Sequence, residues 1–257
     1  MIYLRYRKFD DEAPAYGWME EGRVGAVTPS PFGEHVRGTL KDELERVQLA
    51  APVIPSKIIC TSGNYDARLT EVAEEPAEVP CFFYKPPSAI IGPGAAIKIP
   101  PQSQQVEYGA ELAIVIGRTA RWVSVEDAHN YVLGYTCAND VTARDAAHSD
   151  RRAVRGRSFD TFLPIGPWIA TDVDPSDLVI VCTVNGQVRQ MASTRDMRHS
   201  VPQLVAYLSS IMTLVPGDVI LTGTPGGVGQ IETGDVIEIE IEGIGELRNT
   251  VEGADTA

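Results

Sequence analysis

The sequence predicts a mainly β protein with a few helices, that is, an α+β fold. Short apolar runs bounded by Gly, Pro, Asn or Asp recur along the chain, and such runs are typical of strands. Few stretches show helical periodicity. At 257 residues with 44% hydrophobic content, the chain is long enough to bury a substantial core. We therefore expect one main domain with a small appendage.

Residues 1–54 are expected to form that appendage, a small N-terminal β-rich domain. Its predicted strands are Ile2–Arg7, Tyr16–Glu20 and Arg23–Thr28. Glu21-Gly22 separates the last two and predicts a hairpin. A short polar helix is expected over Leu40–Val47, and the Pro-containing stretch Ala51–Pro55 marks the passage to the main domain, residues 55–257.

The main domain should be rich in strands. The predicted strands are Lys57–Thr61, Glu111–Ile116, Gly134–Asn139, Leu178–Val184, Asp218–Leu221 and Val236–Ile241. Helices are expected at Val125–Tyr131 and Pro202–Leu214. The second shows apolar residues at helical spacing behind Ser200, which is a suitable N-cap.

Composition excludes several classes of partner. The formal net charge is −13, and no Lys/Arg cluster is dense enough to follow a phosphate backbone, so we expect no nucleic-acid partner. No apolar run approaches the ~18 residues of a membrane span, and the first residues do not resemble a signal peptide. The expected location is cytoplasmic. The cysteines show no metal or redox spacing and are expected to be reduced, buried thiols: Cys60, Cys81, Cys137 and Cys182.

One carboxylate pattern suggests a divalent-metal site that lacks a ligand. On a strand, Glu107, Gly109 and Glu111 would share one face, and Asp140 would complete the cluster. Two carboxylates with waters and a chelating substrate can hold Mg²⁺, so the site is weakened without being abolished. Alternatively, Gly109 marks a bulge or a close backbone approach.

The blocks around these residues resemble the fumarylacetoacetate hydrolase family from about Pro55 to Val251. The resemblance rests on several motifs in family order: Gly63-Asn64-Tyr65, Lys85-Pro86-Pro87-Ser88, Asn139-Asp140-Val141, Gly156-Arg157-Ser158-Phe159-Asp160 and Thr222-Gly223-Thr224-Pro225-Gly226. It implies a mixed β-sandwich roll, a homodimer, and Glu111 and Asp140 as ligands of Mg²⁺ or Mn²⁺. It also implies cleavage or decarboxylation of 2-oxo and 1,3-dicarbonyl acids.

Several positions depart from the family pattern. Gly109 stands for a metal-binding Glu, Arg68 for a His that is paired with Glu71, Ala147 for a Gln, and Arg157 for a Lys. Arginine cannot act as a general base near neutral pH, whereas a desolvated Glu71 can abstract a proton. Residues 66–78 would then be a mobile lid, or simply an exposed loop.

The candidate catalytic residues are therefore Glu71, Arg68, Arg144 and Arg157. The candidate substrate-binding residues are Tyr65, Lys85, His148 and Thr224. Guanidinium groups suit carboxylates and enolates, and the alternative role of Arg144 and Arg157 is a salt bridge with Asp145 or Asp160. His148 is the best substitute base nearby, although a surface imidazole is its simpler interpretation.

Together these observations favour an enzyme for a small enolisable 2-oxo acid or 1,3-dicarbonyl compound. The altered residues favour a non-hydrolytic tautomerase, cyclase or lyase that binds Mg²⁺ or Mn²⁺ weakly or needs no metal. The alternatives are a Mg²⁺-dependent C–C hydrolase or decarboxylase, and a catalytically silent small-molecule-binding protein. Two crowded carboxylates need a cation, so an arginine nitrogen is expected within about 4 Å of Glu111 or Asp140 if no metal is present.

Overall fold

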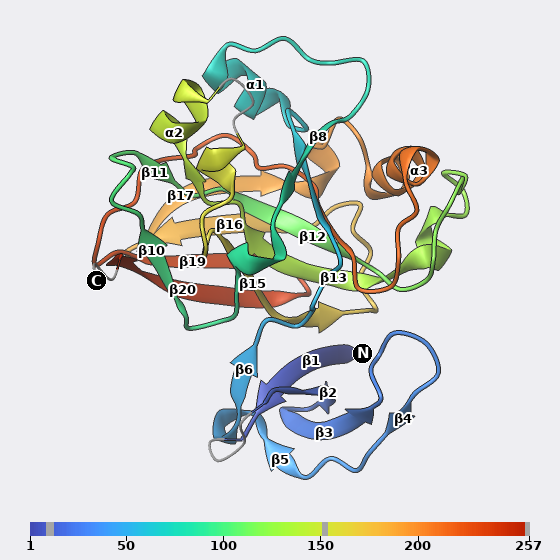
Figure 1. The fold of residues 1–257 in the computed structure, drawn as a ribbon. Coiled ribbons are helices and arrows are strands. Elements are labelled where there is room, and N and C mark those ends of the chain that lie inside the picture. The colour runs from blue at the N-terminus through green and yellow to red at the C-terminus, as the bar shows by residue number, and fades with distance from the viewer. Residues whose placement is uncertain (9–12, 151–153, 255–257) are drawn as a thin grey trace.

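A computed structural model describes residues 1–8, 13–150 and 154–254. It contains a 13-stranded sheet and a 5-stranded sheet that pack together, and the N-terminal strands of the larger sheet lie below the rest (Figure 1). The mainly β class with few helices is confirmed.

The N-terminal strands pair as antiparallel neighbours. They are β1 (Ile2–Arg7), β2 (Ala15–Glu20), β3 (Arg23–Thr28), β4 (Val36–Arg37), β5 (Asp42–Glu43) and β6 (Gln48–Ala50). The predicted hairpin is present, because Glu20 pairs with Arg23 and the turn residues Glu21 and Gly22 have φ values of 48° and 75°. The helix expected over Leu40–Val47 is wrong. Asp42 instead pairs with Val24 on β3, and only a 3₁₀ turn, Leu44–Arg46, follows.

These strands have their own small core and also continue the main sheet. Leu4, Met19 and Val24 are buried together, apart from the other core clusters. Ile2 pairs with Ala170 at the start of an antiparallel ladder between β1 and β15. The division at residue 54 stays a prediction.

The large sheet runs from β1 through β15, β13, β12, β18 and β7 to β8. Its further strands are β7 (Ile58–Ser62), β8 (Cys81–Lys85), β9 (Ile90–Ile91), β12 (Ala110–Ile116), β13 (Val132–Asn139), β15 (Leu163–Ala170) and β18 (Val219–Leu221). Every residue of β12 is buried, as expected for a central strand covered on both faces.

The second sheet covers one face of the first. Its strands are β10 (Ala96–Ile99), β16 (Val179–Val184), β17 (Gln187–Ser193), β19 (Val236–Ile241) and β20 (Gly245–Gly253). Leu112 and Ile114 of β12 lie in one buried cluster with Ile180 and Ile239 of this sheet. Two short strands, β11 (Val106–Glu107) and β14 (Thr142–Ala143), pair at one end of the roll.

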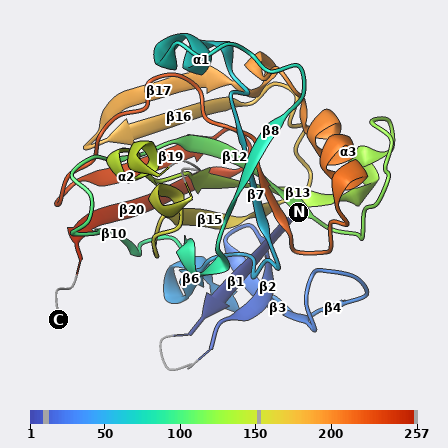
Figure 2. The ribbon, with the colours of Figure 1, turned by 45° about the horizontal axis from the view of Figure 1, so that its top comes forward.

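Helices are short and lie outside the sheets (Figure 2). They are α1 (Asp66–Val72), α2 (Arg144–Ser149), α3 (Val201–Ile211) and the 3₁₀ turns Leu44–Arg46, Pro87–Ala89, Ala128–Tyr131, Arg155–Arg157 and Thr194–Asp196. The helix predicted at Pro202–Leu214 is confirmed as α3, and Gln203 accepts a hydrogen bond from the backbone N–H of Ser200 at its start. The helix predicted at Val125–Tyr131 is wrong, since only a 3₁₀ turn forms there. None of the described helices is long and apolar enough to cross a membrane.

Three of the four cysteines behave as predicted. Cys60, Cys137 and Cys182 are buried free thiols, whereas Cys81 is free and exposed. The prediction of burial was wrong for Cys81 because this residue begins β8, the last strand of the large sheet.

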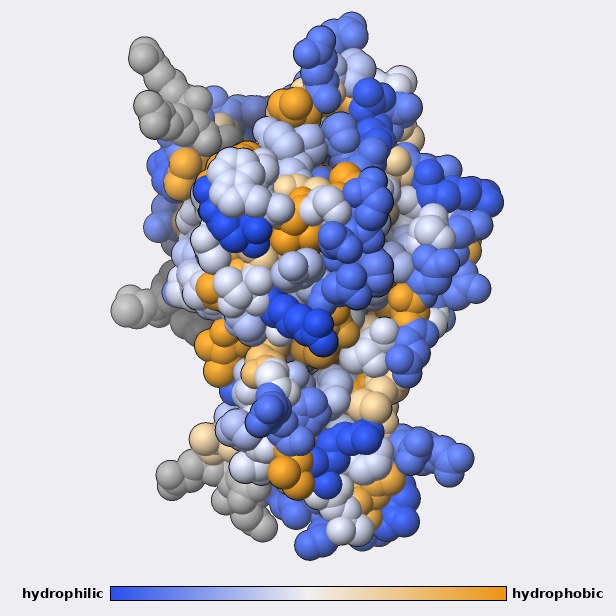
Figure 3. Space-filling view, turned by 90° about the vertical axis from the view of Figure 1, so that its right-hand side faces the viewer, coloured by the Kyte–Doolittle hydropathy of each residue, from blue (hydrophilic) through white to orange (hydrophobic). Residues whose placement is uncertain are grey.

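The face that carries α3 is mostly hydrophilic, with apolar side chains in small groups among the polar ones (Figure 3). This face therefore offers no argument for a particular partner. The homodimer stays a prediction.

Candidate active site

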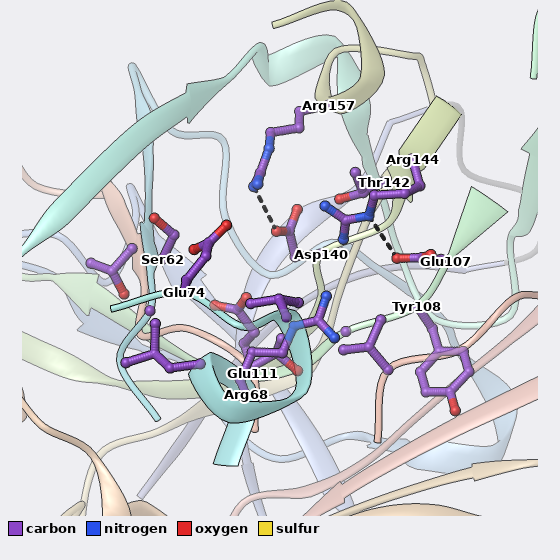
Figure 4. A pocket seen from close by; sticks show the side chains of 17 residues that line it. Ser62, Arg68, Glu74, Glu107, Tyr108, Glu111, Asp140, Thr142, Arg144 and Arg157 are labelled. Carbon is purple, nitrogen blue, oxygen red and sulfur yellow. Dashed lines mark hydrogen bonds and ion pairs between the residues drawn. The ribbon is translucent and has the colours of Figure 1, made fainter. Parts of the chain in front are cut away.

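A cavity of about 90 Å³ opens at the end of the roll that carries α1 and α2. Its wall combines the end of β7, the helix α1, the junction of β11 with β12, the start of β14 and the 3₁₀ turn that ends at Arg157. The predicted lid segment thus begins as a helix, and its role as a lid stays a prediction. Charged side chains dominate the lining (Figure 4). The fold thus brings together segments that lie far apart in the sequence.

The floor of the cavity lies where strand pairing is interrupted between β11 and β12. Tyr108 donates its backbone N–H to the Gly229 carbonyl, and the Gly109 N–H donates to the Asn139 side chain at 2.9 Å. The expectation of one continuous strand over Glu107, Gly109 and Glu111 was therefore wrong. All three nevertheless line the cavity, and so does Asp140.

Gly109 leaves room for a side chain. A Cβ placed there would meet Asp140 O and two side-chain atoms of Thr224 at 3.4 Å, which is ordinary van der Waals contact, and the backbone is not left-handed. The conformation therefore does not require glycine.

Two cations hold the Asp140 carboxylate. Lys85 Nζ lies 2.9 Å from Oδ1, and Arg157 Nη1 lies 3.4 Å from Oδ2. The Lys85 side chain is completely buried and donates hydrogen bonds to three backbone carbonyls, those of Val141, Arg157 and Phe162, so its contact with Asp140 is an ion pair without hydrogen-bond geometry. The expected contact between an arginine and one of the two carboxylates is present.

Arg157 is also held from the side. Its guanidinium carbon lies 3.6 Å from the centre of the Phe83 ring on β8. A planar guanidinium stacks on an aromatic ring at this distance better than the ammonium group of a lysine does. The replacement of Lys by Arg thus places a rigid donor next to Asp140.

Glu111 lies deeper, with 1% of its surface exposed. Its Oε2 accepts a hydrogen bond from the Gly223 N–H at 2.6 Å. Burial, followed by the nearby charge of Asp140, raises the pKa of the Glu111 carboxyl well above its usual range, while Gly223, Arg157 and Lys85 oppose the shift. The buried position of Glu111 therefore disfavours its charged form relative to an exposed carboxylate.

The donor set does not fit a tightly held divalent ion. Among the described residues, no three His, Cys, Asp or Glu side chains gather closely enough to hold a metal. Asp140 is already paired with two cations, and one oxygen of Glu111 accepts from the backbone. Hard cations such as Mg²⁺ prefer several uncommitted oxygen ligands, which this pair does not supply.

Arg144 lies at the first residue of α2 and pairs with Glu107. Its Nε lies 2.8 Å from Glu107 Oε2, and the Gln105 amide donates to the other oxygen. The partners expected for the two arginines, Asp145 and Asp160, were wrong. Asp145 instead accepts hydrogen bonds from the Ser103 hydroxyl and the Gln104 N–H.

Arg68 reaches the cavity from helix α1. Its Nη1 lies 2.5 Å from Glu71 Oε2, and Glu71 Oε1 accepts from the Gly227 N–H at 3.3 Å. Glu71 does not line the cavity, and both its oxygens are engaged. Its predicted role as the base has no direct geometric support.

The predicted substrate-binding residues do not all meet. Thr224 lines the cavity and accepts a hydrogen bond from Gln190. Tyr65 is 1% exposed and Lys85 lies beneath Asp140, so both are behind the cavity wall. His148 is exposed on α2 and does not line the cavity, although it lies one helical turn after Arg144.

Sequence reasoning missed several lining residues, of which Glu74 is the most informative. Glu74 follows α1 and points into the cavity on the side of Ser62, Asp140 and Arg157 (Figure 4). In the sequence it is one of four glutamates between residues 71 and 78, a pattern typical of a solvated surface. Only the turn at the end of α1 distinguishes it.

Comparison with known proteins places this arrangement in a family. The profile of the fumarylacetoacetate (FAA) hydrolase C-terminal family matches residues 57–252. The chain belongs to the fumarylacetoacetate hydrolase family. It is thus a member of an enzyme superfamily, as the sequence motifs indicated. The matched region begins at residue 57, close to the expected start of the main domain at residue 55.

Relatives of this family member carry several names. "Protein Rv2993c" of Mycobacterium tuberculosis is 45% identical over 240 residues, covering 90% of this chain and 91% of the relative. "Oxaloacetate tautomerase FAHD2A, mitochondrial" of Bos taurus is 39% identical, covering 80% and 69%. A structure described as 5-carboxymethyl-2-hydroxymuconate delta-isomerase from Mycobacterium smegmatis is 42% identical, with a TM-score of 0.90 and coverage of 99% and 100%.

A metal-containing relative has also been solved. Maleylpyruvate hydrolase from Sphingobium sp. SYK-6, in complex with manganese(II) ion and pyruvate, is 31% identical, with a TM-score of 0.81 over 99% of this chain and 100% of that one. Similar folds of this family therefore serve both isomerising and hydrolysing enzymes, and the residues of the site must decide between them.

Proposed function

We propose that the protein interconverts the keto and enol forms of a small 2-oxo acid, without a resident metal ion. The observation that carries this proposal is the lining of the cavity: it contains three arginines, two of them paired with lining carboxylates and the third with Glu71 outside the cavity, and no imidazole among the described residues that line it. Such a lining can bind and polarise an anionic carbonyl compound, but it lacks the usual group for activating water.

The arginines supply the electrostatics. Each ion pair uses one nitrogen, namely Arg68 Nη1, Arg144 Nε or Arg157 Nη1, so the same guanidinium groups carry further N–H donors. One of them can bind the substrate carboxylate in bidentate fashion. Another can hydrogen-bond the carbonyl oxygen, where negative charge develops as the enolate forms.

The cavity volume limits the substrate. A buried water needs roughly 10–15 Å³ on this measure, so about 90 Å³ holds roughly six to nine water-sized groups. A 2-oxo acid of the size of pyruvate or oxaloacetate fits this range. The tautomerase and isomerase names among the relatives support the same reaction class.

The competing proposal is a metal-dependent C–C hydrolase, and the manganese-containing relative favours it. Glu111 and Asp140 remain available for a metal if the cations on Asp140 move away. A silent binding protein would keep the arginines and show no turnover.

One pair of assays separates these functions. The protein should accelerate the decay of enol oxaloacetate to the keto form. Hydrolysis of an acylpyruvate should be slower than in a hydrolase by the ~10²–10⁴ that general base catalysis supplies. Rapid acylpyruvate hydrolysis without tautomerase activity would overturn the proposal, and binding without either reaction would indicate the silent protein.

A further inference from the structure

We propose that Glu74 is the general acid–base residue that moves the C3 proton of the substrate. This inference rests on the proposed function, because it names the group that carries the proton in a keto–enol interconversion. It assigns the proton transfer to a residue outside the Arg68–Glu71 pair.

The end of α1 fixes where Glu74 points. Ala73 adopts a left-handed conformation with φ 53° and ψ 40°, and its N–H donates to the Thr70 carbonyl. The Glu74 N–H donates to the Leu69 carbonyl at 3.0 Å, which completes the pattern of a Schellman motif. This turn reverses the chain and directs Glu74 toward the cavity.

Leu69 anchors the turn to the body of the protein. Its side chain is 6% exposed, lines the cavity, and approaches Gly63 so closely that a Cβ on this glycine would lie 3.1 Å from Leu69 Cδ2. A non-glycine residue in the left-handed region persists only where the surroundings hold it. The backbone turn that carries Glu74 is therefore held by the body of the protein, while the Glu74 side chain itself is exposed.

The other cavity carboxylates are already committed. Glu107 is paired with Arg144, Asp140 with Lys85 and Arg157, and Glu111 accepts from Gly223 at the floor. In contrast, the Glu74 side chain has no hydrogen-bond or ion-pair partner in the part of the chain that the structure describes. A base must have a lone pair free for the substrate, and Glu74 meets this condition.

The reaction balances with one carboxylate. The Glu74 carboxylate takes a proton from C3, the C–H electron pair forms the C2–C3 double bond, and the carbonyl pair moves to the oxygen. The Arg157 side chain, which lies on the same side of the cavity in Figure 4, stabilises this enolate. The protonated Glu74 then gives its proton to the enolate oxygen, and the carboxylate is restored. The reverse sequence converts enol into keto form.

The test compares Glu74→Gln with Glu75→Gln, a matched control. Glu75 is the next residue and is exposed, as Glu74 is. Both residues line a small neighbouring pocket, but only Glu74 also lines the cavity. With oxaloacetate as the probe, Glu74→Gln should lower kcat by about 10²–10⁴ with little change in KM, and should slow deuterium incorporation at C3 equally. Glu75→Gln should match the wild type, and Glu74→Asp should recover part of the rate.

Distinct results would overturn the inference. Full activity of Glu74→Gln, or equal losses in both glutamine variants, would show that Glu74 does not move the proton. A higher KM with unchanged kcat would show that it only binds the substrate. Absence of tautomerisation and exchange in the wild-type protein itself would instead refute the proposed function, and the role of Glu74 with it.

Discussion

The floor and the rim of the cavity are built differently. On the floor, Glu111 and Asp140 lie on or next to central strands and Lys85 ends the edge strand β8; all three are almost fully buried and have backbone or ionic partners. On the rim, Arg68 and Glu74 belong to a seven-residue helix and the turn after it. Substitutions on the floor should therefore destabilise the fold, whereas substitutions on the rim should cost little stability.

The largest expected effect lies on the floor. Lys85→Met removes a buried cation that serves three carbonyls and Asp140, so it should reduce the free energy of unfolding by about 3–5 kcal/mol. Lys98→Met is the control, because the Lys98–Glu252 pair lies at the surface, with side chains 31% and 54% exposed, and surface pairs contribute only about 0–1 kcal/mol. Urea denaturation measures both. Equal losses would show that the floor is not a special structural unit.

On the rim, activity should change and stability should not. Arg68→Met removes a charged donor from the cavity, and hydrogen bonds to charged groups contribute about 1.5–3 kcal/mol, so kcat/KM for oxaloacetate should fall by roughly 10–100-fold. Arg46→Met, which changes an exposed arginine paired with Glu43, should leave kcat/KM unchanged. A large loss of stability in Arg68→Met would break the distinction between floor and rim.

At Gly109, restoring a carboxylate should strengthen metal binding. Gly109→Glu adds a third carboxylate where a Cβ fits, and should tighten Mg²⁺ or Mn²⁺ binding by at least ~10-fold. Gly109→Gln is the uncharged control of equal size. Calorimetry checks the affinities. Micromolar binding by the wild-type protein would contradict our account of Gly109.

The smallest effect concerns pH. The pKa of Glu111 is raised in the folded state, so its stabilising contribution is complete below its unfolded pKa, near 4.5, and is lost as the pH rises toward the folded pKa. Glu111→Gln should abolish this loss while keeping an acceptor for Gly223. The difference between the two unfolding free-energy curves isolates Glu111. A wild-type curve that rises relative to the variant above pH 4.5 would reverse the sign we assign.

The sequence predicts the floor much better than the rim. Runs of buried apolar residues predict β12 and most of β13, alternation of Ile with Glu predicts β19, and the resemblance adds Glu111 and Asp140. The two wrongly predicted helices have weak helical periodicity. At Leu40–Val47 the chain pairs with β3 instead, and at Val125–Tyr131 it forms only a 3₁₀ turn.

The ion-pair partners could not be predicted from local pattern. Arg144 and Glu107 are 37 residues apart and meet only because β11 pairs with β14, whereas the nearer Asp145 turns toward Ser103. Similarly, Glu74 is distinguished from the neighbouring glutamates only by the left-handed residue before it. Long-range backbone geometry therefore determines the chemistry of the rim.

The most direct test of the central claim is the metal dependence of tautomerisation. The rate of oxaloacetate enol–keto conversion should be measured after exhaustive chelation, and again after addition of Mn²⁺ or Mg²⁺. If Lys85 and Arg157 balance the charge of Asp140 in place of a metal, the chelated protein should keep its full rate and added metal should not increase it. A rate that vanishes with the chelator and returns with Mn²⁺ would contradict the account.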